Sequence, residues 1–311
     1  MKIAAIVGPT GVGKTEISIY TAKALNAEII SCDSMQVYKG MDIGTAKITK
    51  DEMQGVKHWL LDIADPRQNF SVCNFTQMCK SAAEDISSRG KLPLIVGGTG
   101  LYVDSFVNGA EFCEQKSDIK YRKELENIAK NNGAEYLHKM LEKADKKSAE
   151  KIHTNNVKRV IRALEYHHLT GSTISQHNEQ DKLRPPAYDC MYIGLTRNRD
   201  ELYKRIDMRV DKMLAGGLLD EVKKLVGSGI KKNCTAMQAL GYKELLWYMH
   251  GLLTYGEAVR ILKRDSRHYA KRQLTWFNRN KNIHWINLSN YSHISDAAHE
   301  CETVINNFLK G

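Results

Sequence analysis

The chain has 311 residues, of which 42% are hydrophobic and 26% are charged, an ordinary balance that is sufficient for a folded core. It contains no run of 18 apolar residues, so the sequence predicts no membrane-spanning helix, and the apolar start is too short for a signal peptide. Seven cysteines without a C-x-x-C spacing argue against a disulfide framework and a structural zinc site, and they favour reduced thiols in the cytoplasm.

The net charge of +10 is unevenly distributed along the chain. Residues 1–115 carry a net charge of −2, whereas residues 116–196 carry +4 and residues 197–311 carry +8. A near-neutral first part followed by a basic remainder fits a large polyanionic partner such as a nucleic acid, although solubility alone would also explain it.

The first 110 residues alternate strand and helix patterns. The predicted strands are Ile3–Val7, Ala27–Cys32 and Leu92–Val96, and the predicted helices are Lys14–Leu25 and one that Ser71 caps and Gly90 ends. Short strands that alternate with helices indicate a parallel sheet with helices on both faces.

The pattern changes near residue 115. Residues 116–182 are charged and helical in character, and Pro185-Pro186 ends them. We therefore predict a helical insertion domain over residues 115–185, within a sheet domain made of residues 1–114 and 186–311. In the second part of the sheet domain we expect a strand at Met191–Leu195, helices over 197–280, a late strand at Trp285–Leu288 and a closing helix at Ile294–Leu309.

A phosphate-binding loop follows the first predicted strand. The loop matches G-x-x-x-x-G-K-[ST] at every fixed position. It consists of Gly8, Pro9, Thr10, Gly11, Val12, Gly13, Lys14 and Thr15. Such a loop turns its N–H groups toward phosphate oxygens, its lysine adds positive charge, and its threonine hydroxyl can ligate Mg²⁺. Because it lies between a strand and a helix, a chance glycine-rich turn is a poor alternative.

The loop indicates phosphate, not a particular nucleotide. A kinase or NTPase would also use an apolar strand that ends in an aspartate to hold Mg²⁺. The strand Leu92–Val96 ends instead in Gly97-Gly98, and Asp62 after a short apolar run is the available substitute. The usual NTPase set of residues is therefore incomplete.

Asp33 directly follows the strand Ala27–Cys32. Active sites of doubly wound sheets gather beyond the carboxyl ends of strands, so we expect Asp33 beside the phosphate loop. Its carboxylate could ligate Mg²⁺, act as a general base, or simply cap the next helix.

Arg209 lies on the apolar stripe of a predicted helix, between Leu202, Ile206 and Met213. A guanidinium on a buried face is costly unless an anion meets it. An internal carboxylate and a bound phosphate are both possible partners, and the phosphate loop favours the second.

A further helix, over residues 157–164, has an apolar face and a basic face. We call its basic face, Lys158, Arg159 and Arg162, the basic ridge. The ridge could follow a nucleic-acid backbone, or it could be an ordinary solvated helix face.

Together these features resemble the tRNA dimethylallyltransferase (tRNA isopentenyltransferase) family, over nearly the whole chain. The motifs that carry the resemblance are GPTGVGKT (8–15), DSMQVYKGMDIGTAK (33–47), LIVGGTGLY (94–102), the IH-x-x-N-x-x-R-x-x-RALE run (152–165), LYKRIDMRVDKML (202–214), ALGYKE (239–244) and AKRQLTWF (270–277).

The resemblance implies a P-loop NTPase-like α/β core, with a parallel sheet and an inserted all-helical domain. The implied reaction moves a dimethylallyl group from dimethylallyl diphosphate to N6 of the adenosine 3′ of the anticodon in tRNA, with Mg²⁺ and without ATP. The family members without a C-terminal zinc finger are the bacterial form, which this chain resembles. From this likeness we expect a cytoplasmic monomer.

The resemblance also implies roles for individual residues. Asp33 looks like the general base, Arg209 matches the family's catalytic arginine, and Thr10 and Lys14 match residues that face the diphosphate, with Thr15 on the metal. The positions that match tRNA-contacting stretches are Asp33, Ser34, Met35, Gln36, Thr99, Arg122, Lys158, Arg159, Val160, Ile161, Arg162, Gln238, Ala239, Leu240, Gly241, Tyr242 and Lys243.

Two of these positions depart from the family's pattern, since Lys158 stands where glutamine is common and Gln238 where a basic residue can occur. Two other functions fit parts of the sequence. A small-molecule kinase would release ADP and no diphosphate, and an RNA-binding NTPase or chaperone would leave no modified nucleoside.

Overall fold

The computed structural model describes residues 1–109 and 118–311. The chain divides into two compact units, of which the first comprises Met1–Gly109 and Ala187–Gly311 and the second is Ala110–Pro186. The boundary predicted between residues 114 and 115 lies outside the described residues.

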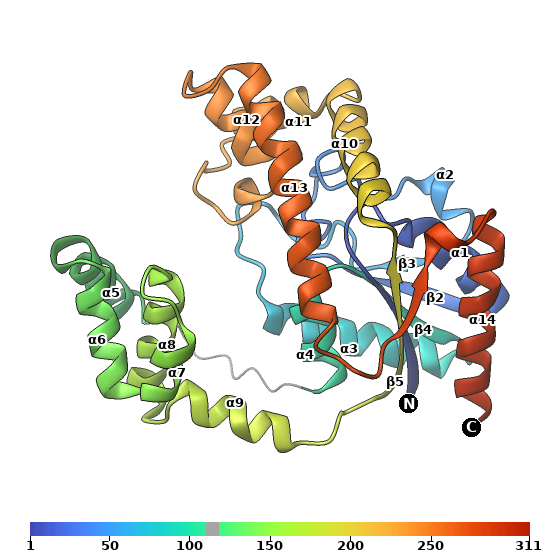
Figure 1. Cartoon of the computed structure of the whole chain (residues 1–311), viewed down its shortest axis with the longest axis horizontal. Helices are drawn as coiled ribbons and strands as arrows, with labels where there is room; N and C mark the ends of the chain where they lie inside the picture. The colour runs from blue at the N-terminus through green and yellow to red at the C-terminus, as the bar shows by residue number, and fades with distance from the viewer. Residues whose placement is uncertain (110–117) are drawn as a thin grey trace. The chain divides into compact units, whose positions relative to one another are not determined.

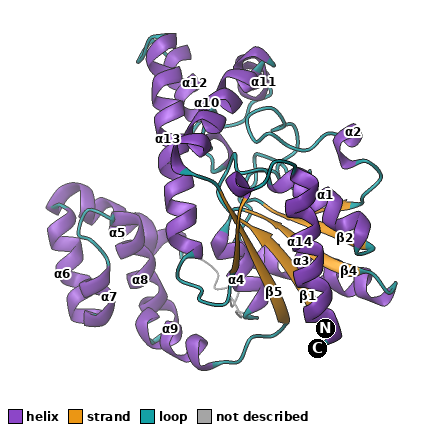
Figure 2. Cartoon of the chain, turned by 45° about the vertical axis from the view of Figure 1, so that its right-hand side comes forward, coloured by secondary structure: helices purple, strands orange, loops and turns teal. Residues whose placement is uncertain are grey.

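A six-stranded parallel sheet forms the centre of the first unit, with the strand order β3-β2-β4-β1-β5-β6 (Figures 1 and 2). The α/β class and the parallel sheet predicted from the sequence are thus confirmed. The strands are β1 (Lys2–Val7), β2 (Ala27–Cys32), β3 (His58–Trp59), β4 (Leu92–Gly97), β5 (Asp189–Thr196) and β6 (His284–Asn287).

Helices cover both faces of this sheet because alternate side chains of each buried strand point to opposite sides. On β1, Ala4 and Ile6 face one apolar cluster, whereas Ile3, Ala5 and Val7 face the other. The first cluster contains α1 (Lys14–Ala24) and α14 (Ile294–Lys310), and the second contains α3 (Val72–Ser88) and α4 (Gly100–Val107). Ser71 caps α3 as predicted, by accepting from the Asn74 N–H.

A further set of helices packs on the loop that follows β2. The buried residues Val37, Tyr38 and Met41 of this loop lie in one cluster with apolar side chains of the later helices. Those helices are α10 (Arg199–Ala215), α11 (Leu218–Gly227), α12 (Tyr242–Met249) and α13 (Tyr255–Phe277); the short helices α2 (Lys50–Met53), η1 (Ala236–Gln238) and η2 (Leu288–Asn290) lie in the connections.

The described part of the second unit is all-helical, as its composition predicts. Its own apolar core contains Leu125, Leu137, Leu141, Val160 and Leu164. The helices are α5 (Ile119–Asn132), α6 (Ala134–Ala144), α7 (Lys146–Lys151), α8 (Val157–Thr170) and α9 (Ile174–Leu183). Across the described residues of both units, we find no helix with the length and apolar character that crossing a membrane requires.

Candidate active site

The phosphate loop lies between β1 and α1, where its glycines are needed for close contact. A Cβ on Gly8 would come within 2.5 Å of the Leu195 carbonyl oxygen, and Gly13 has a left-handed φ of 115° at the start of α1. The first N–H groups of a helix have no partner within the helix, so those of Lys14 and Thr15 remain available to an anion.

Side chains hold the carbonyl groups of this loop. The Lys14 ammonium donates to the Gly8 and Pro9 oxygens at 3.0 and 2.9 Å. Arg205 Nε donates to the Gly11 oxygen at 3.0 Å, and Arg197 Nε donates to the Val12 oxygen at 2.8 Å. Neither arginine belongs to the loop motif, yet both fix the peptide groups that an anion would meet.

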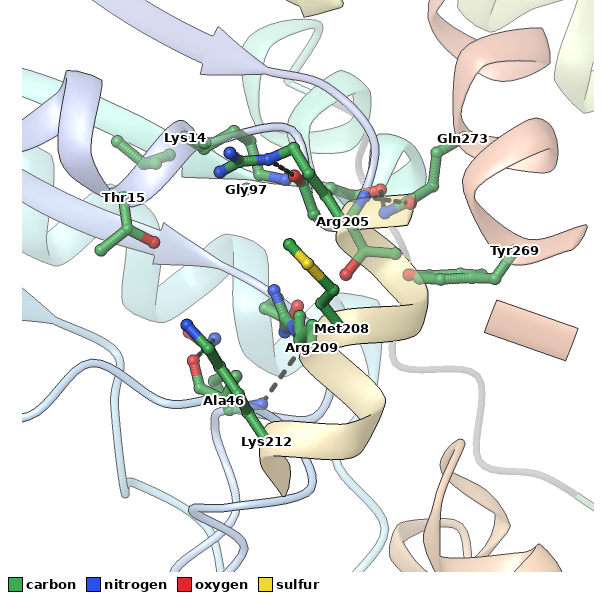
Figure 3. Close-up of a pocket in the computed structure, with 17 residues that line it drawn as sticks. Lys14, Thr15, Ala46, Gly97, Arg205, Met208, Arg209, Lys212, Tyr269 and Gln273 are labelled. Atoms are coloured by element: carbon green, nitrogen blue, oxygen red, sulfur yellow. Dashed lines mark hydrogen bonds between the residues drawn. The ribbon is translucent and has the colours of Figure 1, made fainter. Parts of the chain in front are cut away.

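A cavity of about 350 Å³ opens at the loop and is shown in Figure 3. We call it the first cavity. Its cationic lining consists of Lys14, Arg205, Arg209 and Lys212, and Asp33 is the carboxylate in its described lining. This charge pattern suits a multiply charged anion.

Lys14 lies deep in the first cavity. Burial, and to a smaller extent the Arg209 guanidinium, lowers the pKa of Lys14 to about 7, although Asp33 acts in the opposite direction. A bound anion would favour the charged ammonium.

Asp33 lies at the end of β2, facing this cavity as the strand-end argument predicts. Its Oδ1 accepts from the N–H groups of Met35 and Gln36 at 2.8 and 3.3 Å, so it closes a turn and does not cap a helix. Its Oδ2 has no protein partner among the described residues and is free to accept a proton.

Arg209 projects from α10 into the first cavity. Its Nη2 donates to the Thr45 carbonyl oxygen at 3.2 Å, and no carboxylate of the described residues lies within ion-pair distance of it. Burial lowers the pKa of Arg209, and Asp33 opposes that shift. An arginine always remains charged in proteins, so of the two possible partners, a carboxylate and a bound anion, the geometry favours the bound anion.

A second cavity of about 280 Å³ adjoins the first. Four residues line both cavities: Thr10, Asp33, Arg209 and Tyr269. The second cavity also has apolar walls from α10 and the loop after β2, and the sequence-predicted residues that line it are Ser34, Met35, Gln238, Ala239, Leu240 and Lys243.

Of the other predicted tRNA contacts in the first unit, Gln36 lines the first cavity, whereas Thr99, Gly241 and Tyr242 line neither cavity. The Thr99 hydroxyl accepts from the Ser34 N–H at 3.1 Å, and the Gln36 amide donates to the Thr45 carbonyl at 3.2 Å. Tyr242 is buried and does not line either cavity.

The loop of residues 42–44 is held by a residue that the sequence did not point to. The Glu221 carboxylate accepts from the N–H groups of Asp42, Ile43 and Gly44 at 2.8–3.1 Å, and it also accepts from the Tyr242 hydroxyl at 2.5 Å. The same loop carries Thr45, whose carbonyl receives Arg209.

Gln273 lies in the motif AKRQLTWF (270–277), which did not by itself predict a role for this residue. Its side chain accepts from the Thr10 N–H at 2.8 Å and donates to the Gly98 carbonyl at 2.9 Å. It therefore joins the phosphate loop to the turn after β4, and Thr10 and Gln273 are 263 positions apart in the sequence.

Asp62, the candidate for a metal-holding aspartate of the NTPase type, does not line either cavity. It pairs with Lys47 at 2.6 Å and has a left-handed φ of 54°. The Thr15 hydroxyl lines the first cavity, while no cluster of three His, Cys, Asp or Glu side chains that could hold a metal occurs in residues 1–109 and 118–311. This set fits a Mg²⁺ ion that takes most of its oxygens from a bound diphosphate and water.

In the second unit, the basic ridge lies on α8. Lys158 and Arg159 are exposed, whereas the side chains of Val160 and Ile161 are buried in the core of this unit. Arg162 and Arg122 both pair with the buried Glu165, at 3.3 and 2.5 Å, and each keeps more than 40% of its side chain exposed.

Known proteins match this chain over most of its length. A family model described as IPP transferase matches residues 36–280. The tRNA dimethylallyltransferases of Acetivibrio thermocellus and Bacillus subtilis are 51% and 50% identical to this chain over 282 and 284 residues, 91% of this chain and 90% of each relative.

Solved structures are similar over the whole chain. A tRNA isopentenylpyrophosphate transferase from Bacillus halodurans matches with a TM-score of 0.75 and 47% identity, covering 99% of this chain and 97% of that one. A eukaryotic dimethylallyltransferase acting on tRNA matches with a TM-score of 0.85 and 30% identity, covering 99% of this chain and 79% of that one.

Proposed function

The chain belongs to the IPP transferase family of tRNA dimethylallyltransferases, and on that premise we propose how its residues perform the transfer. The dimethylallyl group of dimethylallyl diphosphate passes to N6 of the adenosine 3′ of the anticodon in tRNA, and diphosphate is released. The observation that carries this assignment is the meeting of a phosphate-loop cavity with a second, more apolar cavity at Thr10, Asp33 and Arg209.

The first cavity binds the donor. The loop from Gly8 to Thr15 offers N–H groups to the diphosphate, and Lys14 and Arg209 face it with positive charge. Negative charge grows on the diphosphate as the bond to carbon breaks, so these fixed donors stabilise the transition state more than the ground state. Mg²⁺ held by the Thr15 hydroxyl would supply further charge neutralisation.

The second cavity receives the adenine. An adenine amine is a weak nucleophile because its lone pair is delocalised into the ring, and positive charge builds on N6 as it attacks. The free Oδ2 of Asp33 accepts the departing proton. The base must leave its stacked position in the loop to reach this cavity.

The tRNA contacts are assigned to two surfaces. In the first unit they are Asp33 to Gln36, Thr99 and Gln238 to Lys243. Of these, Tyr242 acts indirectly, through the hydrogen bond that its hydroxyl donates to Glu221. In the second unit they are Arg122 and the stretch Lys158 to Arg162. Val160 and Ile161 are buried, so the basic side chains of this stretch supply its contacts to tRNA. We assign the activity to a monomer in the cytoplasm, where its substrate tRNA is found.

The experiment is nucleoside mass analysis of tRNA incubated with the protein, dimethylallyl diphosphate and Mg²⁺, without any nucleotide. The wild type should form N6-dimethylallyladenosine and release diphosphate. Asp33→Asn should lower turnover by about 10²–10⁴-fold while tRNA still binds. A requirement for ATP, or ADP formed in step with product, would support the kinase alternative, and near-normal turnover of the variant would remove Asp33 from the base role.

A further inference from the structure

Tyr269 is the fourth residue that lines both cavities, and it has no part in the transfer as proposed. The other three are Thr10, Asp33 and Arg209, which carry the loop, base and anion-binding roles. If the two cavities hold the two substrates, a side chain that borders both lies where the reacting carbon and nitrogen meet.

The hydroxyl of Tyr269 points toward the other side chains that line the first cavity, as Figure 3 shows. The residue lies on α13, whose next turn supplies Gln273, and Gln273 fixes the phosphate loop through Thr10. Ser266 and Ala270 on the same helix are buried. The phenol is therefore carried by an element that is already tied to the donor-binding loop.

A chain of hydroxyl groups determines how the phenol can bond. The Thr99 hydroxyl lies 3.5 Å from the Ser34 hydroxyl and accepts from the Ser34 N–H at 3.1 Å. Tyr269 is hydrogen-bonded to Thr99. Because the hydrogen bond with Thr99 lowers the pKa of Tyr269, the phenol oxygen accepts it, and the second lone pair of that oxygen remains available to a substrate N–H.

The ionisation of the phenol agrees with this arrangement. Burial, and next the Asp33 carboxylate, raises the pKa of Tyr269 well above its ordinary value. The side chain is therefore a neutral phenol throughout the physiological range. It can accept and donate hydrogen bonds but does not compete with Asp33 for the proton.

We propose that Tyr269 is a further catalytic residue, whose hydroxyl oxygen accepts a hydrogen bond from the acceptor amine. This inference rests on the proposed function. The N6 amine has two hydrogens, so Asp33 Oδ2 takes one as a proton and Tyr269 holds the other. The N6–C1 bond forms, the bond from C1 to the diphosphate oxygen breaks with its electron pair, and the proton leaves N6 for Asp33.

The geometric consequence is an amine held by both hydrogens, with its lone pair directed at the donor carbon. A near-attack arrangement of this kind affects the rate of the chemical step more than the affinity for either substrate. Loss of one hydrogen bond at a reaction centre costs about 1.4–2.7 kcal/mol, equivalent to 10–100-fold in rate.

The test compares Tyr269→Phe with wild type in single-turnover reactions at saturating tRNA and dimethylallyl diphosphate. We expect a 10–100-fold slower step, with the donor affinity, tRNA affinity and melting temperature all close to wild type. Tyr248→Phe is the matched control, because Tyr248 lies on α12 and lines neither cavity. That variant should react at the wild-type rate.

Three results would overturn the inference: a wild-type single-turnover rate for Tyr269→Phe, a loss that disappears once tRNA is saturating, or equal losses of rate, donor affinity and melting temperature. The first removes the hydroxyl from the reaction, the second makes it a binding group only, and the third makes it structural. Absence of dimethylallyladenosine with wild-type protein would instead refute the proposed function itself.

Discussion

At the scale of single residues, the site is defined by groups whose charge is not neutralised inside the protein. Arg209 meets no carboxylate within ion-pair distance among the described residues, and Lys14 contacts carbonyl oxygens but no acid. Burial makes both arrangements costly in the absence of a ligand. The protein thus maintains positive charge for an anion that arrives with its own negative charge.

Lys14 makes this cost measurable as a pH dependence. Its pKa is lowered to about 7 in the free protein, mainly by burial and next by Arg209. The bound diphosphate favours the ammonium and raises that pKa, so donor binding takes up a proton above pH 7. Donor affinity should be greatest below pH 7 and should fall by up to about tenfold per pH unit above it, until the pKa of the bound form is reached.

The measurement is calorimetric titration of dimethylallyl diphosphate between pH 6 and pH 9, in buffers of different ionisation enthalpy. Lys14→Arg is the control, because a guanidinium stays charged throughout this range. Its affinity should change less above pH 7, whatever its absolute value. Equal pH profiles for wild type and Lys14→Arg would show that Lys14 is not the titrating group.

At the scale of an element, α8 combines a buried face with a basic ridge, but the three ridge residues are not equivalent. Arg162 pairs with the buried Glu165, whereas Lys158 and Arg159 are exposed and have no ion-pair partner in the described part of the chain. Double substitution of Lys158 and Arg159 by Ala should weaken tRNA binding. It should also reduce the slope of log affinity against log salt by about 0.7–0.9 for each phosphate that the wild-type side chains neutralise.

Folding should hardly change in that variant, since alanine is the best helix former and both positions are solvated. A matched control is Lys139→Ala with Lys143→Ala, which removes two exposed lysines from α6 of the same unit. A salt titration of tRNA binding compares the two variants with wild type. If the Lys158 and Arg159 variant gives a line that coincides with wild type, the ridge is only a solvated helix face.

The elements that sequence could predict are those whose signals are local. The alternation of strands and helices, the phosphate loop and Asp33 at the end of β2 each depend on a few neighbouring residues. Glu221 was out of reach, because it bonds a loop more than 170 positions away and lies outside every motif. Gln273 lies in the motif AKRQLTWF (270–277), but the motif could not show that its side chain bonds Thr10, 263 positions away. The pairing of Arg162 with Glu165, an i,i+3 pair, could be predicted from spacing. The burial of Glu165 could not, because it depends on packing in the second unit.

Tyr269 belongs to the same class as Glu221 and Gln273. It precedes a motif that the sequence singled out, but only the meeting of α13 with the ends of β2 and β4 brings its hydroxyl to Thr99 and Asp33. The sequence identified the chemistry of the site through its charged groups. Neutral groups that orient those charges carry no comparable compositional signal.

At the scale of the whole molecule, the first unit is interrupted but its two ends are joined. The chain leaves this unit at Gly109 and returns at Ala187, and the N–H groups of Ala187 and Tyr188 donate to the Val107 carbonyl at 3.0 and 3.2 Å. A Cβ on Gly109 would lie 2.6 Å from the Ala187 Cβ. The two ends of the interruption thus meet within the fold of the first unit.

This closeness makes a deletion feasible. Replacing residues 110–186 by a linker of about four Gly and Ser residues should leave the first unit folded, because such a linker spans about 10–12 Å and the sheet, both of its helical faces and both cavities lie outside the deleted segment. The deletion variant should bind dimethylallyl diphosphate with an affinity within a few-fold of wild type. Its tRNA affinity should fall by at least tenfold, with a shallower salt dependence, because Arg122, Lys158 and Arg159 are removed together.

Circular dichroism and thermal melting establish folding, calorimetry measures donor binding, and a salt titration measures tRNA binding. A folded variant that keeps wild-type tRNA affinity would assign tRNA binding to the first unit alone, where the basic residues of α10 and α13 would have to supply it. A folded variant that no longer binds the donor would show that the diphosphate site depends on the second unit, contrary to the proposed division of labour.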